Sequence, residues 1–141
     1  MQNPAPNSRR KLKIENPFSD AEVRDIEKVI GRKLPKDYLD FVKTFGSPFV
    51  GGSIDGLVHF SIQGFHNASY VVHYNKYNAE LAAEGAFAIA CNNVANPYVI
   101  TEDDSVYYID YYSRMHGKDL KAEKVSDSFS DFLARIVLDE D

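Results

Sequence analysis

Two stripes of apolar residues at helical spacing open the chain. Ser19 and Asp20 are N-cap residue types placed just before the first stripe, and Gly31 follows it, where glycine commonly ends a helix. Pro35 stands at the start of a second helix, where its missing N–H costs no hydrogen bond. The first stripe consists of Val23, Ile26 and Ile30, and the second of Tyr38, Phe41, Val42 and Phe45. The pattern predicts two amphipathic helices that share a core.

The middle of the chain predicts a loop, a strand and a third helix. Residues 46–56 contain four glycines and a proline, which indicates a loop. Residues 57–63 alternate between the two faces of a strand. A third helix is expected from an N-cap near Asn67 to a stop at Gly85. Its apolar stripe is Tyr70, Tyr74, Tyr77 and Leu81, at i, i+4, i+7 and i+11.

Short strands dominate the C-terminal half of the pattern. They are predicted at residues 87–90, 98–101 and 106–112, with a further short strand around Val125. The polar turn Glu102-Asp103-Asp104-Ser105 has the length of a hairpin connection. A closing helix then completes the pattern.

The closing helix carries the clearest signals. Ser126, Asp127 and Ser128 offer N-caps, and Asp131 lies where the helix dipole favours negative charge. Residues 113–121, which precede it, show no periodicity and predict a mobile connection. The buried face is expected to consist of Phe129, Phe132, Leu133, Ile136 and Val137.

This order of elements predicts an α+β fold, with an antiparallel sheet backed by helices. Two helices are N-terminal, one lies in the middle and one is C-terminal. Residues 1–13 are expected to form a flexible basic tail, and residues 14–141 a single domain. The expected helical core is Val23, Ile26, Ile30, Leu34, Tyr38, Phe41, Val42, Phe45, Phe129, Phe132, Leu133 and Ile136.

The charge of the chain is unevenly distributed. The formal net charge of the 141 residues is −5, but four basic residues and no acid lie within the first 13. Residues 14–141 therefore hold 12 basic and 21 acidic residues, a balance of −9. Such a domain repels nucleic acid phosphates and suits a basic protein partner. The simpler alternative is that the acidity only keeps the protein soluble.

The residues with chemical potential do not form a recognisable catalytic, cofactor or metal site. The glycines of residues 51–56 lack the Gly-Lys-Ser/Thr continuation of a phosphate loop. His59, His66 and His73 are seven residues apart, without the closer spacing of metal ligands. Cys91, the one cysteine, follows an apolar strand and is expected to be buried. We therefore expect no enzyme, no cofactor and no metal.

Cysteine usage and hydropathy indicate the compartment. A single cysteine gives no disulfide framework. The first residues have no apolar segment of the kind found in a signal peptide, and no apolar run is long enough to span a membrane. The expected location is the cytoplasm, without membrane contact.

Two motifs of the chain form a recognisable combination. The first runs from Ile26-Glu27 through Ile30-Gly31-Arg32-Lys33-Leu34-Pro35 to Asp37-Tyr38 and Phe41. The second is the closing Ser128-Phe129-Ser130-Asp131-Phe132-Leu133. Together they resemble the SUKH superfamily, in its Smi–Knr-like branch. The resemblance covers roughly residues 20–138 and implies an α+β fold. For a short acidic member it implies an immunity protein that binds and neutralises a cognate toxin. The alternatives are a regulatory or scaffolding domain of the same fold and a small ligand-binding domain.

A toxin-binding role predicts an acidic, tyrosine-bearing contact surface. On the predicted strand 106–112, alternation places Tyr108, Asp110 and Tyr112 on one face, and the acids of the preceding turn cap the same hairpin. Packing of this face under a helix is an equally reasonable alternative. The candidate contact residues are Asp55, Glu102, Asp103, Asp104, Tyr108, Asp110 and Tyr112.

Overall fold

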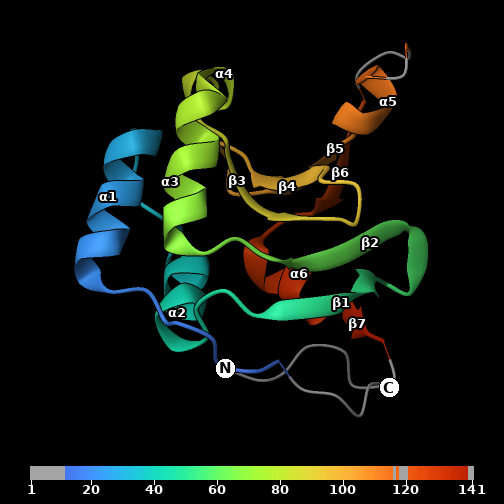
Figure 1. The fold of residues 1–141 in the computed structure, drawn as a ribbon, viewed down its shortest axis with the longest axis horizontal. Coiled ribbons are helices and arrows are strands. Elements are labelled where there is room, and N and C mark those ends of the chain that lie inside the picture. The colour runs from blue at the N-terminus through green and yellow to red at the C-terminus, as the bar shows by residue number, and fades with distance from the viewer. Residues whose placement is uncertain (1–11, 116, 118–120, 140–141) are drawn as a thin grey trace.

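The computed structural model describes residues 12–115, 117 and 121–139. These residues form a seven-stranded antiparallel sheet with helices packed against it (Figure 1), in the strand order β6-β5-β4-β3-β2-β1-β7. The predicted α+β class is confirmed. The helices are α1 (Asp20–Ile30), α2 (Lys36–Thr44), α3 (Ala68–Tyr77), α4 (Ala79–Ala83), α5 (Tyr111–Met115) and α6 (Phe129–Ala134). The strands are β1 (Phe49–Ile54), β2 (Leu57–Phe65), β3 (Phe87–Cys91), β4 (Pro97–Ile100), β5 (Val106–Ile109), β6 (Ala122–Ser126) and β7 (Ile136–Leu138).

Local signals set the ends of α1 as predicted. Ser19 accepts a hydrogen bond from the Glu22 N–H (3.1 Å), and the Glu22 carboxylate accepts one from the Ser19 N–H (2.9 Å). This reciprocal capping box satisfies two donors that a helix start leaves unpaired. Gly31 ends the helix in the left-handed region (φ 74°). The same logic holds at α3, where the predicted N-cap Asn67 accepts from the Tyr70 N–H.

The sheet consists of two parts joined by a short overlap. β2 pairs with β3 only through Gly64–Cys91 and Phe65–Ala90, so β3 continues beyond the end of β2. The sheet also curls, and the curl brings β2 close to strands that are not its neighbours in the sheet. The Tyr98 hydroxyl donates to the Ser61 carbonyl oxygen at 2.7 Å. The curl encloses the core.

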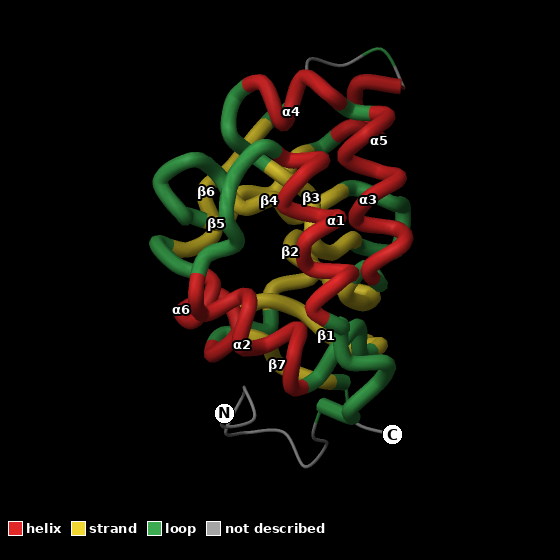
Figure 2. The backbone as a smooth tube through the Cα atoms, turned by 90° about the vertical axis from the view of Figure 1, so that its left-hand side faces the viewer, coloured by secondary structure: helices red, strands yellow, loops and turns green. Residues whose placement is uncertain are grey.

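The main core lies between the sheet and the helices, and all twelve residues of the predicted helical core are buried. α2 packs against α6, and α1 against α3 (Figure 2). The Phe41 and Phe129 rings meet edge to face with centroids 5.2 Å apart, and Phe132 contacts Tyr98 at 5.3 Å. A smaller cluster covers the other face of β3–β5 and consists of Leu81, Ala86, Ala88, Val99 and Ile109, with Tyr74, Tyr107 and Tyr111 against it.

The predicted loop at residues 46–56 is wrong, because it contains β1. The sequence pattern does not reveal the steric reason for a glycine at position 52. A Cβ on Gly52 would lie 2.3 Å from the Val137 carbonyl oxygen, so the glycine is what allows β7 to pair with β1. The pattern places Ile136 and Val137 on the buried face of the closing helix, but that helix ends at Ala134, they form β7, and Val137 is only half-buried. Ile136 is nevertheless buried, as expected.

Two further boundaries differ from the prediction. The third helix is interrupted at Asn78, which separates α3 from α4. The strand predicted to end at residue 112 ends at Ile109, and Tyr111 begins α5. Asp110 accepts a hydrogen bond from the Ser113 N–H (2.9 Å), as an N-cap residue does, and so favours a helix start over strand continuation. Part of the predicted mobile connection is therefore helical, and residues 116 and 118–120 lie outside the described residues.

Of the predicted tail, only Leu12 and Lys13 are among the described residues. Leu12 is 7% exposed and belongs to the main core, so the domain begins before the predicted boundary at residue 14. Residues 1–11 lie outside the described part of the chain, and their role in folding stays a prediction.

Phe132→Ala should destabilise the domain by about 3–5 kcal/mol, because it removes a fully buried ring and leaves a cavity. Tyr38→Phe is the matched control. The Tyr38 hydroxyl is buried and has no hydrogen-bond partner among the described residues. Its removal should leave stability unchanged or raise it by about 1 kcal/mol. Urea unfolding measures both values, and a loss of stability in Tyr38→Phe would contradict the unpaired hydroxyl.

Candidate protein-binding site

The seven candidate contact residues do not share one strand face. Glu102, Asp103 and Asp104 lie in the β4–β5 turn, whereas Asp110 and Tyr112 lie beyond the other end of β5. The four residues of β5 separate these groups by roughly 13 Å. Asp55 lies in the turn between β1 and β2. The prediction that Tyr108, Asp110 and Tyr112 share one face of a strand is wrong, because β5 ends at Ile109 and α5 begins at Tyr111.

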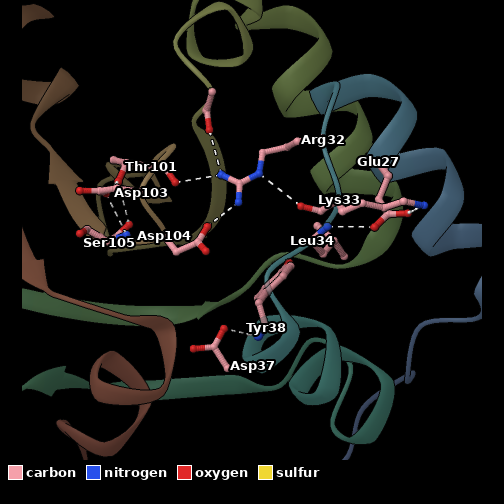
Figure 3. Close-up of polar contacts among 11 residues, drawn as sticks. Glu27, Arg32, Lys33, Leu34, Asp37, Tyr38, Thr101, Asp103, Asp104 and Ser105 are labelled. Atoms are coloured by element: carbon pink, nitrogen blue, oxygen red, sulfur yellow. Dashed lines mark hydrogen bonds and ion pairs between the residues drawn. The ribbon is translucent and has the colours of Figure 1, made fainter.

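Asp104 is committed to an internal ion pair with Arg32 (Figure 3). Arg32 lies in the α1–α2 loop and also donates to the carbonyl oxygens of Thr101 (2.9 Å) and Gly85 (3.2 Å). Its guanidinium lies over the Phe87 ring, 5.8 Å from the centroid. One side chain therefore connects the N-terminal helices to the start of β3 and to the β4–β5 turn, and Asp104 neutralises it.

Asp103 shapes the turn in which it lies. Its carboxylate accepts from the Thr101 hydroxyl (2.6 Å) and from the Ser105 N–H (3.2 Å). The hydrogen bond from Thr101, followed by those from Ser105, lowers the pKa of Asp103 below its ordinary value. The side chain is exposed all the same, so its negative charge faces solvent.

Tyr108 and Asp110 belong to a polar network at the other end of β5. The Tyr108 hydroxyl is an acceptor for the side-chain amides of Asn92 and Asn96, both at 2.9 Å. Asn96 also donates to Asp110 at 3.0 Å. Hydrogen bonds from Ser113 are the main cause of the lowered pKa of Asp110. This network fastens the β3–β4 turn to β5 and α5.

Asp55 is likewise engaged, with Arg135. The Arg135 Nη2 lies 2.7 Å from the Asp55 carboxylate, and the Asp55 N–H donates to the Arg135 carbonyl oxygen at 2.7 Å. This pairing raises the pKa of Arg135. It holds the β1–β2 turn against the segment between α6 and β7. Asp55, Asp104, Tyr108 and Asp110 therefore all serve the fold.

An acidic hollow remains at the β4–β5 turn. It has a volume of about 590 Å³ and is lined by Glu84, Thr101, Glu102, Asp103 and Tyr107. The three carboxylates belong to exposed residues, and Tyr107 is half-buried. Sequence reasoning included Glu102 and Asp103 but missed Glu84 and Tyr107. Tyr107 was discernible as the neighbour of Tyr108 that points to the opposite face of β5.

Of the described histidines, His59 and His66 have different surroundings. His66 and Glu15 line one hollow of about 290 Å³, and both His66 ring nitrogens are buried and have no partner among the described residues. His59 is exposed, with its Nε2 3.0 Å from a Glu123 carboxylate oxygen. In the described part of the chain, no three His, Cys, Asp or Glu side chains are grouped so that they could hold a metal ion. Cys91 is half-buried, and burial raises the pKa of its thiol.

The two-part sheet, the two N-terminal helices and the closing Ser-Phe helix define an α+β domain that carries both predicted motifs. The chain belongs to the SMI1/KNR4 family (SUKH-1), whose family model matches it from residue 17 to residue 135. No curated protein matches the chain. None of the helices in the described ranges combines the length and apolarity needed to cross a bilayer.

His66 should titrate at about pH 4, because burial penalises the imidazolium. The ordinary pKa of about 6.5 applies to the unfolded chain, which therefore binds the proton first as pH falls. Stability present above about pH 6.5 is lost between that pH and about pH 4. The difference between a pKa of 6.5 in the unfolded chain and about 4 in the folded domain corresponds to about 3 kcal/mol.

The measurement is an NMR titration of the His66 ring together with urea unfolding at pH 7 and pH 4. His66→Phe is the control, since it keeps a ring against Tyr70 and cannot titrate. The loss of stability on acidification should be smaller in this variant by about the stated amount. An ordinary titration of His66 near pH 6.5 would contradict the assignment.

Proposed function

We propose that the protein is an immunity protein that binds a cognate, basic toxin domain and neutralises it by covering its active surface. The observation that carries this proposal is the acidic hollow, in which three carboxylates surround a half-buried tyrosine. Membership of the SUKH-1 family supports a protein partner. In this proposal the domain is non-catalytic and acts in the cytoplasm of the cell that it protects.

The electrostatic part of the mechanism follows from which acids are already paired. Asp55 and Asp104 face arginines of the same chain, so their charge is largely neutralised internally. Glu84, Glu102 and Asp103 line a hollow that has no basic residue among its described lining groups. Their field extends into solvent and accelerates the encounter with a positively charged surface. Glu102 and Asp103 thus remain proposed contact residues from the original set, joined by Glu84.

The aromatic part holds the complex once it has formed. Tyr107 packs against the small core cluster and also lines the acidic hollow, so the cluster supports its ring. A ring of this kind offers apolar area and a π face to an arginine or lysine side chain. Tyr112, which is 45% exposed on α5, remains a second proposed contact. Tyr108 is buried and acts by positioning the β3–β4 turn.

The double charge reversal Glu84→Lys with Glu102→Lys should slow association with the cognate toxin domain by about tenfold or more at low salt. The difference should shrink as salt rises, because the Debye length falls to about 8 Å at physiological ionic strength. Tyr107→Ala should instead accelerate dissociation. Stopped-flow or surface-binding kinetics at two salt concentrations measure both effects.

The matched control is Asp40→Lys with Asp131→Lys, which changes the net charge equally at exposed positions of α2 and α6. It should retain most of the association rate. If both double variants associate equally fast, the acidic hollow is not the contact surface. Protection of cells that produce the toxin separates immunity from a regulatory or scaffolding role, since only an immunity protein restores their growth.

A further inference from the structure

The helix α3 carries aromatic side chains on the face that points away from the sheet. Its buried residues are Ala68, Val71 and Asn75, whereas Tyr70 and Tyr77 are 48% and 82% exposed. Tyr70 and Tyr77 therefore lie on the outside, and Tyr74 is half-buried. The tyrosines and His73 form what we call the aromatic ridge, which consists of Tyr70, His73, Tyr74 and Tyr77.

Asn75 fixes the rotation of α3 that exposes the ridge. Its side-chain oxygen accepts from the Ala88 N–H (2.8 Å), and its amide nitrogen donates to the Ala88 carbonyl oxygen (3.2 Å) and to Val71 (2.8 Å). Asn75 is 1% exposed, so these bonds form away from water, where an unpaired amide is costly. Rotation of α3 to bury the ridge would break them.

The rings of the ridge are ordered against one another. Tyr70 and Tyr74 stack with centroids 5.9 Å apart and an interplanar angle of 23°, and His73 and Tyr77 stack at 6.2 Å and 12°. Tyr70 also rests on the buried ring of His66, at 4.4 Å. A partner therefore meets rings that are already positioned, which lowers the conformational entropy lost on binding.

Carboxylates border the ridge on two sides. Glu22 and Asp25 of α1 line a hollow of about 250 Å³ together with His73. At the other end, Glu80 lies near enough to Tyr74 to add to the effect of burial in raising the pKa of that tyrosine. Glu84, which directly follows α4, is one of the residues that line the acidic hollow. Lys76 is the one basic residue within α3.

The ridge is also continuous with the surface proposed above. Tyr74 from α3 and Tyr107 from β5 pack against the same small core cluster, on the same face of the sheet. Aromatic rings beside carboxylates match a planar, delocalised cation, which stacks on the ring and pairs with the acid. Lysine fits less well, because its charge is compact and strongly hydrated.

We infer that the aromatic ridge of α3 is a docking surface for an arginine-bearing segment of a basic protein partner. This inference rests on the proposed function and adds a second contact surface beside the acidic hollow. The ridge supplies stacking contacts that slow dissociation, while the hollow accelerates association.

Three acetylated, amidated peptides test the chemistry: one alternates arginine with alanine, one substitutes lysine and one substitutes neutral citrulline. The arginine peptide should shift the ring NMR signals of Tyr70, His73 and Tyr77 at low salt. The lysine peptide should bind more weakly, and the citrulline peptide should not bind. Arginine-induced shifts that map elsewhere, or equal binding of citrulline, would overturn the inference.

The variant Tyr70→Ser with Tyr77→Ser should bind the arginine peptide about tenfold more weakly and release the toxin domain faster by a similar factor. The matched control is Phe49→Ser with Val58→Ser, which removes exposed apolar side chains from β1 and β2 and should change neither value. Melting curves verify that all variants fold, and Tyr77→Ser alone provides a variant at a side chain that is 82% exposed.

The outcomes separate the ridge from the proposed function. Unchanged release of the toxin by both ridge variants overturns the ridge and leaves immunity standing. A wild-type protein that binds the arginine peptide at the ridge but not the toxin supports the ridge and overturns immunity. Sedimentation in which the wild type dimerises and the double variant does not would show a surface for self-association, which also overturns the inference.

Discussion

The hydrogen bonding of one buried amide decides which surface this domain presents. α3 has apolar residues on two faces, and the sheet can cover only one of them. The Asn75 side chain makes the two hydrogen bonds with the Ala88 backbone that a neighbouring strand would otherwise make. Ala88 lies where the β3–β4 pairing is irregular. Because both backbone groups of Ala88 are satisfied by a helix side chain, the position and rotation of α3 on the sheet are fixed together. The location of the aromatic rings follows from that fixed rotation.

Internal pairing divides the acidic residues into two groups with different roles. Arg32 and Arg135 each draw an aspartate, Asp104 and Asp55, into a contact that joins distant segments of the chain. Among the described residues, Glu84, Glu102 and Asp103 around Tyr107 and Glu80 of α4 have no ion pair with an arginine, and all four are exposed. Net charge alone therefore overstates how many acids are available to a partner.

Much of the fold could be predicted because its signals are local. Ser19, Glu22 and Gly31 mark the ends of α1 within a few residues, and the apolar stripes of α1, α2 and α6 identify the core. β1 could not be predicted in this way, because the reason for Gly52 is a carbonyl of residue 137. The tyrosine stripe of α3 predicted a helix correctly, but periodicity cannot tell which of two apolar faces is buried.

The candidate site was harder to predict than the fold for the same physical reason. Residues 102 and 103 were identified from their charge, and both line the acidic hollow. Whether an acid is available depends on a cation far away in the sequence, as with Asp104 and Arg32. Glu84 and Tyr107 reach the hollow only through the packing of α4 and β5. Neither belongs to a motif that a sequence pattern would single out.

The pairing of β1 with β7 has a consequence for how the domain assembles. β1 and β2 form a hairpin of nearby residues, which closes quickly, whereas β1 and β7 are far apart in the sequence, so their pairing is expected to form later, together with the docking of α6. In that interval the outer edge of β1 has unpaired N–H and C=O groups, and Gly52 leaves it without a side chain to obstruct another strand. The same bare edge that later accepts β7 is thus a transient template for intermolecular association. Slow docking of α6 would lengthen that exposure and favour aggregation over folding.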